Sequence, residues 1–321
     1  MRNKFCLFLL SSILVIAEPA DASSYRATPQ KECTTVGLSA PLGPNRSQGD
    51  IGWCYANTAA DLITYHFQDE LIGARASAVY IALAYSTNFE NGGLSSLAIV
   101  KAQSSGFCPM SSEEDFRNRG PSVGLKEKLK NLIELKKRYD ASGGKSLAED
   151  MKLIYEPTNS ILATIPKADL INIFENSTPK TIAKKLADYF CQGDRIYPKH
   201  FAFVVPKSKY LYGGSTKELM STIHEQLGPL HKNILSISYF TDFFEADGAK
   251  NTNASRHVSV VVGRRWNQNR CEIQIRNSWG SSCAGYKAAS LKAPGMCVDG
   301  NIWVPEETLA NAIFGVTYIM K

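Results

Sequence analysis

The sequence predicts an α+β fold in which helices come first along the chain and strands come last. Apolar residues recur at helical spacing in the N-terminal half, whereas alternating and β-branched residues gather after residue 230. The 321 residues are 44% hydrophobic and 21% charged, which is ordinary for a globular protein with a sizeable core. The sequence has no internal repeat and no glycine-rich phosphate loop. It therefore predicts one large domain or two smaller ones.

The first segment of the chain has the pattern of an export signal. Arg2 and Lys4 precede an apolar run over residues 5–17, and Ala20 and Ala22 supply the small residues that a signal peptidase reads. The alternative is a membrane anchor, but 13 helical residues span about 20 Å, less than the roughly 30 Å hydrocarbon core. We expect cleavage after Ala22 and a secreted or periplasmic mature protein that has no membrane segment and is a monomer.

The next elements are predicted in order from their apolar spacing. Residues 23–47 are predicted to be irregular, because Pro, Ser, Thr and Gly are frequent there. Helices are expected over residues 54–68, 76–86 and 94–103, and then, in a charged region, near 125–138, 145–155, 167–175 and 178–191. Strands are expected over residues 233–240, 257–263, 271–276 and 302–304. The predicted division is a signal at 1–22, an N-terminal segment at 23–47, a helical lobe at 48–109, a mainly helical insertion at 110–227 and a β-rich lobe at 228–321.

Charge and cysteine usage narrow the class of protein. Lys and Arg outnumber Asp and Glu by 36 to 30 without any dense basic run, so we expect no nucleic-acid partner. No CxxC or HExxH spacing occurs, so we expect no metal and no other cofactor. Seven cysteines remain after signal cleavage, which indicates three disulfides and one free thiol. Of the 15 possible connectivities, we favour Cys283–Cys297, which bracket a short excursion, Cys108–Cys191, and by subtraction Cys33–Cys271.

The unpaired cysteine has a chemical context. Cys54 begins a predicted helix, where the helix dipole and free backbone N–H groups favour a thiolate. A thiolate nucleophile needs a base and an oxyanion donor, and His257 and Asn277 each lie at the end of a predicted strand. Gln48 lies six residues before Cys54, on the same loop. Each residue alone is weak evidence for catalysis, but the four together, in this order, indicate a site for acyl transfer.

Four motifs resemble those of the papain-like cysteine peptidases, the C1 family. They are residues 48–56 (QGDIGWCYA), 91–93 (NGG), 256–263 (RHVSVVVG) and 276–280 (RNSWG), in the family's order. The resemblance covers about residues 40–106 and 228–310. It implies a papain-like two-lobe fold with a helical lobe, an antiparallel barrel-like β-lobe and a cleft between them.

The resemblance also implies residue roles. Cys54 would be the nucleophile, His257 its proton partner and Asn277 the group that orients the imidazole. The Gln48 side chain and the Cys54 N–H would form the oxyanion hole. The implied substrate-binding positions are Gly92, Gly93, Leu94, Ser95 and Val258, with Trp279 shielding the Asn–His contact.

The sequence departs from the family pattern at several positions. Ile51 and Glu90 stand where the family has a disulfide pair, so both partners are missing together. Trp53 replaces a small residue and is expected to narrow the cleft. Arg256 replaces an Asp, and we hypothesise that its charge lowers the pKa of His257.

The distance from Cys54 to His257 is also unusual. It is 203 residues, against about 130–150 in the family, and the excess is the insertion at 110–227. The insertion is a surface elaboration, a recognition region or a lid. Only 25 residues separate Ala22 from Gln48, too few for a long inhibitory propeptide.

These observations predict an exported cysteine endopeptidase that acts on peptides or proteins through a thioester acyl-enzyme. One alternative is an amidase or acyltransferase that uses the same triad. The other is a catalytically silent relative that binds a peptide or partner.

Overall fold

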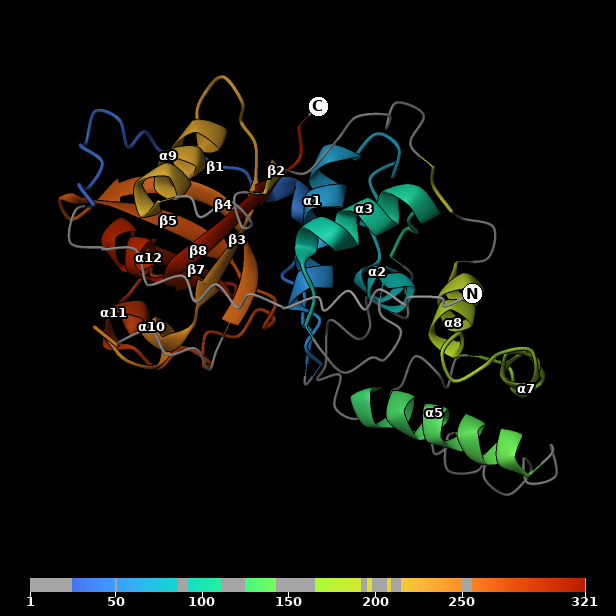
Figure 1. Cartoon of the computed structure of the whole chain (residues 1–321). Helices are drawn as coiled ribbons and strands as arrows, with labels where there is room; N and C mark the ends of the chain where they lie inside the picture. The colour runs from blue at the N-terminus through green and yellow to red at the C-terminus, as the bar shows by residue number, and fades with distance from the viewer. Residues whose placement is uncertain are drawn as a thin grey trace, which may run out of the picture.

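The computed structural model describes residues 25–49, 51–85, 92–110, 125–142, 165–191, 195–197, 207–208, 215–249 and 256–320. Within these residues the chain is α+β, as predicted, with one core among helices and a second core behind an antiparallel sheet. Figure 1 shows the two lobes side by side. The predicted signal at 1–22 and the predicted helix near 145–155 lie outside the described residues.

The helical lobe is built around α1 (Cys54–His66), which packs against α2 (Ala78–Tyr85) and α3 (Ser95–Ser105). These three helices confirm the predictions at 54–68, 76–86 and 94–103. Helix α1 is buried on nearly all sides, because Ala56, Ala59 and Ala60 let neighbouring elements approach closely.

Three further helices extend the core of the helical lobe. They are α5 (Leu125–Ala141), α7 (Lys167–Glu175) and α8 (Ile182–Phe190), at the positions where the sequence predicts helices. Leu132, Leu170 and Leu186, one from each helix, are fully buried in that core. Helix α8 contacts both α2 and α7, and Figure 1 shows α5 at the outer end of this group.

The sheet lobe contains eight strands among the described residues, and every pairing is antiparallel. The strand order is β2-β8-β3-β4-β5-β7-β6, with β1 paired to the far half of β4. The strands are β1 (Val36–Gly37), β2 (Lys207–Ser208), β3 (Leu235–Phe240), β4 (Arg256–Asn267), β5 (Arg270–Arg276), β6 (Cys297–Val298), β7 (Asn301–Pro305) and β8 (Ile313–Tyr318).

The described part of the sheet is antiparallel, as the family resemblance implies, but it does not close into a complete barrel. Closing a sheet requires its two edge strands to pair with each other. Here the edges are β2 and β6, which have two residues each and pair only with β8 and β7. The sheet is therefore open.

Among the described residues, four helices belong to the sheet lobe. Helices α9 (Thr216–Leu227) and α12 (Glu306–Ala312) contact each other and the sheet, and the short α10 (Asp242–Glu245) and α11 (Ala289–Lys292) lie near its other end (Figure 1). The sequence patterns did not predict α9, α12 or β8, nor the short β1 and the 3-10 helix η2 (Ala40–Leu42) within 23–47. A capping box of Ser215 and Glu218 marks the start of α9 and is a signal that could have found it.

Strand β4 contributes side chains to the hydrophobic cores of both lobes. Val260 and Val262 belong to the core of the helical lobe, whereas Val261 belongs to the core behind the sheet. Successive side chains of a strand point to opposite faces, so a fully apolar run here is buried on both sides. This explains the continuous valines that predicted the strand.

The three predicted disulfides are confirmed. Cys33–Cys271, Cys108–Cys191 and Cys283–Cys297 have Cα atoms 5.9, 5.8 and 6.0 Å apart. Cys54 is the free cysteine among the described residues. In that same part of the chain, no helix has the length and apolar character needed to cross a membrane.

Candidate active site

Cys54 is the first residue of α1, as predicted. Its sulfur receives backbone hydrogen bonds from Tyr55, from Cys54 itself and from Val258 on β4. The preceding residue, Trp53, gives the helix no side-chain cap, and its carbonyl accepts from the N–H groups of Ala56 and Asn57, which leaves those of Cys54 and Tyr55 for the sulfur. Trp53 is buried in the helical-lobe core, so the expectation that it narrows a cleft is wrong.

The ionisation of Cys54 differs from the prediction. Burial raises the pKa of the thiol, and this outweighs the three backbone hydrogen bonds, which lower it. The helix terminus alone therefore does not make Cys54 a resting thiolate. A base must take its proton.

His257 is the second residue of β4 and is buried. Its Nε2 atom lies 2.7 Å from Oδ1 of Asn277, which directly follows β5. Burial lowers the pKa of His257 to about 4, while the hydrogen bond to Asn277 acts in the opposite direction. The ring is consequently neutral near pH 7 and can accept a proton.

The charge of Arg256 does not account for this lowered pKa. Burial is its main cause, and Arg256 is exposed, with its guanidinium 5.8 Å from the ring centre of Phe314. The hypothesis that Arg256 tunes His257 is therefore wrong.

The surroundings of Asn277 fix which nitrogen of His257 carries the proton. Oδ1 of Asn277 accepts from the backbone N–H of Ser278 at 2.8 Å and from Oγ of Ser259 at 3.3 Å, and Nδ2 donates to the hydroxyl of Tyr286 at 3.2 Å. Oδ1 is thus an acceptor, so Nε2 of His257 is the donor. Nδ1 is left as the basic nitrogen. Ser259 and Tyr286 were missed because only the folded chain brings them to Asn277.

Aromatic rings enclose the His257–Asn277 pair. The ring centre of Trp279 lies 5.5 Å from that of His257 and stacks on Tyr286 at 5.6 Å. Tyr239 meets the imidazole edge-on at 5.8 Å. Trp279 thus takes the shielding position that the resemblance implies.

Gln48 is held by contacts on both sides of its carboxamide. Its Nε2 donates to the carbonyl of Ile51 at 3.0 Å, and its Oε1 accepts from Oγ of Ser278 at 2.5 Å. Its backbone N–H donates to the carbonyl of Ser278 at 2.8 Å. The loop before Cys54 is thereby joined to the loop that carries Asn277.

One side-chain contact brings Cys54 next to His257. Thr58, one turn after Cys54 on α1, donates its hydroxyl to the carbonyl of Val258 at 3.3 Å. Val258 follows His257, and it is also the residue whose backbone contacts the Cys54 sulfur. The structure therefore places the nucleophile candidate and the base candidate together at the boundary of the two lobes.

The other predicted substrate-binding residues differ in exposure and in the elements that they contact. Gly93 lies against α1, where an added Cβ would come within 2.7 Å of Tyr85 and 3.1 Å of Tyr55. Gly92 is exposed, and Leu94 precedes the first turn of α3. Ser95 is buried with its hydroxyl 2.9 Å from that of Ser236 on β3, so it links the lobes.

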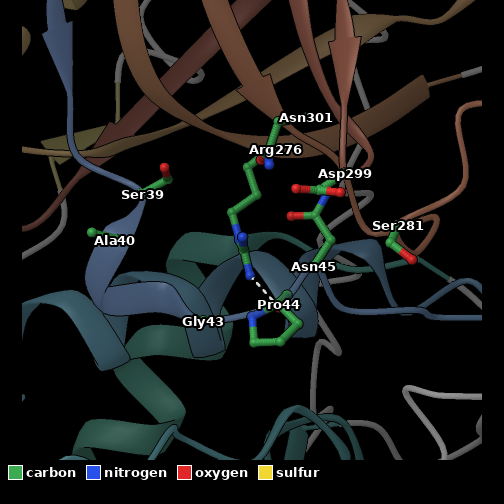
Figure 2. A pocket seen from close by; sticks show the side chains of 9 residues that line it. All are labelled: Ser39, Ala40, Gly43, Pro44, Asn45, Arg276, Ser281, Asp299 and Asn301. Carbon is green, nitrogen blue, oxygen red and sulfur yellow. Dashed lines mark hydrogen bonds between the residues drawn. The ribbon is translucent and has the colours of Figure 1, made fainter.

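A cavity of about 460 Å³ is lined by residues from the segments that carry the site, but by none of the predicted site residues themselves (Figure 2). Its polar lining includes Asn45, Arg276 and Ser281, which are near neighbours in sequence of Gln48, Asn277 and Trp279. In Figure 2 the side chain of Arg276 reaches across the cavity toward Pro44. The remaining lining residues are Ser39, Ala40, Gly43, Asp299 and Asn301.

One group of three possible metal ligands occurs in the described part of the chain: His224, Cys271 and Glu306. Cys271 is bonded to Cys33, and Glu306 accepts hydrogen bonds from Tyr25 and Thr28. The donor set therefore does not suit a metal, and the group attaches the N-terminal segment to α9 and α12.

No protein-family model and no curated protein matches the sequence. Solved structures similar to this one are papain-like cysteine peptidases. They include digestive procathepsin L 3 of Tenebrio molitor larval midgut, at 10% identity and a TM-score of 0.48, covering 95% of this chain and 73% of that chain. Xylellain, a cysteine protease from Xylella fastidiosa, has 15% identity and a TM-score of 0.46, with 95% and 94% covered. At such identities, the chemistry of this chain rests on its own residues.

Proposed function

We propose that this protein is an exported papain-like cysteine endopeptidase that cleaves peptide bonds through a Cys54–His257–Asn277 mechanism. The observation that carries the proposal is the 2.7 Å contact between Nε2 of His257 and Oδ1 of Asn277. Val258, the residue after His257, has its backbone at the Cys54 sulfur, so the thiol lies beside this pair. A free thiol, an oriented imidazole and an orienting amide form the set that acyl transfer requires.

The protonation states favour general-base activation of the thiol. Cys54 is protonated at rest because burial raises its pKa, and His257 is neutral because burial lowers its pKa. Nδ1 of His257 takes the thiol proton while the sulfur bonds to the substrate carbonyl carbon. The same proton then passes to the leaving amine, which departs and leaves a thioester on Cys54.

Hydrolysis of the thioester completes the cycle. Nδ1 of His257 takes a proton from water, the hydroxide oxygen bonds to the acyl carbon, and the sulfur leaves and recovers its proton. In both steps the backbone N–H of Cys54 and the amide of Gln48 are proposed to stabilise the oxyanion. Gln48 is suited to this role because contacts to Ile51 and Ser278 fix its carboxamide.

Export is part of the proposal. Disulfides persist in oxidising compartments, and three of them hold this chain together while Cys54 stays free. The predicted signal at residues 1–22 would place the protein outside the cytoplasm.

The test is labelling of the mature chain, residues 23–321, with an epoxysuccinyl cysteine-peptidase inhibitor, together with hydrolysis of a peptide library. We expect a single adduct in the intact mass, peptide cleavage by the wild type, and neither in Cys54→Ala. An adduct without cleavage would favour the silent relative. Product that carries an added amine nucleophile in place of water would favour the acyltransferase.

A further inference from the structure

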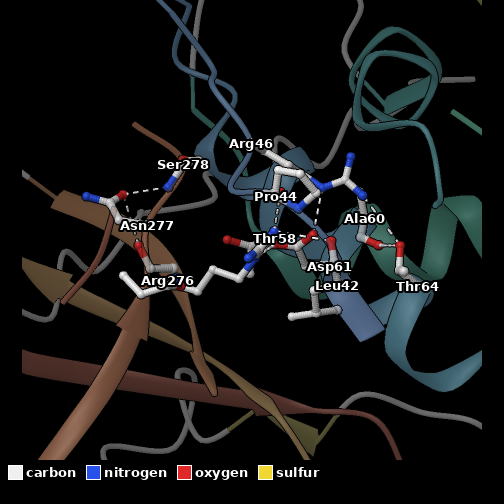
Figure 3. A network of polar contacts seen from close by, with 12 residues as sticks. Leu42, Pro44, Arg46, Thr58, Ala60, Asp61, Thr64, Arg276, Asn277 and Ser278 are labelled. Atoms are coloured by element: carbon white, nitrogen blue, oxygen red, sulfur yellow. Dashed lines mark hydrogen bonds and ion pairs between the residues drawn. The ribbon is translucent and has the colours of Figure 1, made fainter. Parts of the chain in front are cut away.

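The most deeply buried charged cluster of the described chain lies beneath the proposed active site. Oδ1 of Asp61 lies 2.6 Å from Nε of Arg46, and Oδ2 lies 2.8 Å from Nε of Arg276 (Figure 3). Nη2 of Arg75 is 3.6 Å from Oδ1. The side chains of Asp61, Arg46 and Arg276 are only 6%, 1% and 2% exposed.

Each of these residues belongs to a segment that carries one of the proposed catalytic groups. Asp61 lies on α1, two turns after Cys54. Arg46 lies two residues before Gln48, and Arg276 immediately precedes Asn277. One carboxylate therefore joins the nucleophile helix, the oxyanion loop and the end of β5.

We infer that Asp61 is a positioning residue, which holds Cys54, Gln48 and Asn277 in mutual register through its ion pairs with Arg46 and Arg276. The inference rests on the proposed function. Asp61 itself is not a catalytic residue, because it acts through the two arginines.

The arginines pass the constraint on to the backbone. Nη2 of Arg276 donates to the carbonyls of Pro44 at 2.6 Å and Leu42 at 3.3 Å, which fixes the start of the loop that leads to Gln48. The carbonyl of Arg46 accepts from the N–H of Gly280 at 2.8 Å, just beyond Trp279. Hydrogen bonds thus join the loop that carries Gln48 to the segment that carries Asn277 both before and after Asn277 in the chain.

The charge of Asp61 is needed for this arrangement. Burial acts to raise the pKa of Asp61, but the charges of Arg276, Arg46 and Arg75 outweigh it and hold the pKa at about 2. The carboxylate is thus ionised at every pH at which the enzyme would work. Removing its charge leaves two buried guanidinium groups without their counterion, which strains the contacts that they anchor.

A second carboxylate offers a matched control. Glu272 on β5 is fully buried and pairs with Arg265 at 2.8 Å and Arg270 at 3.1 Å. All three residues lie on the β4–β5 hairpin, at its far end from Asn277. Like Asp61, Glu272 is a buried carboxylate between two arginines, but its cluster lies at the end of the hairpin opposite to His257 and Asn277 and, among the described residues, makes no ion pair with α1 or the Gln48 loop.

The experiment compares Asp61→Asn with Glu272→Gln in the full mature chain. The readouts are kcat and KM on a peptide substrate, the rate of Cys54 alkylation by iodoacetamide, and the unfolding temperature. For Asp61→Asn we expect kcat to fall about 10- to 100-fold with KM changed less than about threefold, and alkylation to change severalfold, since small displacements of reacting groups have effects of this size. Glu272→Gln should lower the unfolding temperature but leave kcat and alkylation within about twofold of the wild type.

Arg276→Lys is the second variant, for the case in which Asp61→Asn does not fold. Lysine keeps the positive charge but cannot bond Asp61 and the Pro44 carbonyl in the fork geometry of arginine, so kcat should again fall while the chain stays folded. An unchanged kcat in folded Asp61→Asn or Arg276→Lys would overturn the inference, and so would an equal loss in Glu272→Gln. If the proposed function is wrong, the wild type itself will cleave no peptide. The alkylation rates of Cys54 still test whether Asp61 positions the thiol, so the two failures can be told apart.

Discussion

The two lobes hold their proposed catalytic groups in different ways. In the sheet lobe, His257 and Asn277 lie on adjacent strands and have several polar and aromatic partners each, including Ser259, Tyr286 and Trp279. In the helical lobe, Cys54 is placed by the start of one helix, by backbone groups at its sulfur and by one side-chain hydrogen bond, from Thr58 to Val258. The sheet lobe therefore orients the imidazole of His257, and the helical lobe supplies the sulfur of Cys54.

The alignment of the lobes depends on polar contacts that cross the boundary between them. Those in the described chain include Thr58 to Val258, Ser95 to Ser236 and Asp61 to Arg276. Packing along β4 buries apolar surface but is not directional, whereas hydrogen bonds and ion pairs fix register. We therefore expect changes within a lobe to affect stability most, and changes between lobes to affect catalysis most.

The largest effect on stability is expected from the disulfides, and it should follow loop length. The chain-entropy relation gives losses of about 5.5 kcal/mol for Cys33–Cys271, about 4.5 kcal/mol for Cys108–Cys191 and about 3 kcal/mol for Cys283–Cys297 when each pair is replaced by Ala. The pairs close loops with sequence separations of 238, 83 and 14 residues. Urea unfolding of the three double variants measures the free energy of unfolding.

Cys54 is blocked by alkylation in all samples, so that no new disulfide forms. Equal losses for the 238-residue and 14-residue loops would show that packing around each bridge, and not loop closure, sets its contribution.

The second prediction concerns the pH dependence of stability, which differs between His257 in the sheet lobe and Asp61 in the helical lobe. His257 has a pKa lowered to about 4, so between pH 6.5 and 4 the unfolded chain binds a proton that the folded chain does not. Stability therefore falls as the pH falls through this window, by about 3 kcal/mol. Asp61 also has a lowered pKa, about 2, and its contribution is lost only below its ordinary value of 3.8.

Urea unfolding of the wild type and His257→Gln at pH 7, 6, 5 and 4 measures the first window. The variant should lack most of the slope that the wild type shows. Parallel curves for the two proteins would mean that other groups cause the acid sensitivity.

The smallest effect concerns the contact from Thr58 to Val258. Thr58→Val keeps the shape of the side chain and removes one buried hydrogen bond, with an expected loss of about 1 kcal/mol in stability. Because that bond holds Cys54 beside His257, we also expect kcat to fall by about three- to tenfold. Peptide hydrolysis and thermal unfolding measure the two quantities.

Thr222→Val is the matched variant. Thr222 is buried on α9 and donates to the carbonyl of Glu218 at 2.8 Å, inside one lobe. It should lose similar stability without loss of kcat. A fall in kcat in both variants would remove the distinction between contacts within and between lobes.

Parts of the fold follow from local sequence patterns. The helix that begins at Cys54 and the strands at 257–263 and 271–276 were predictable, because apolar spacing and β-branched runs are local properties. Strand β8 was missed because its pattern covers only six residues, whereas α9 was missed although the capping box of Ser215 and Glu218 marks its start. The openness of the sheet was not predictable, because it depends on the pairing of distant edge strands.

The candidate site was predictable to a similar degree. The order and spacing of Gln48, Cys54, His257 and Asn277 marked them in the sequence, and the structure brings the segments that carry them together. The role of Asp61 was not predictable from pattern. A charged residue within the apolar helix 54–66 is an anomaly, but nothing local shows that its partners are Arg46 and Arg276, which lie 15 residues before it and 215 after it.

The sequence by itself determined the fold class, the number of disulfides and the positions of the proposed catalytic residues, while the pairing of the cysteines came from the structure. The first three depend on residue type, spacing and the number of cysteines, which the chain carries in any conformation. Only the tertiary structure decided that Cys54 is a half-buried thiol with a raised pKa, that His257 is neutral and that Asn277 fixes its tautomer. Those properties arise from burial and from contacts between residues far apart in the chain, because desolvation and hydrogen bonding exist only once the chain has folded.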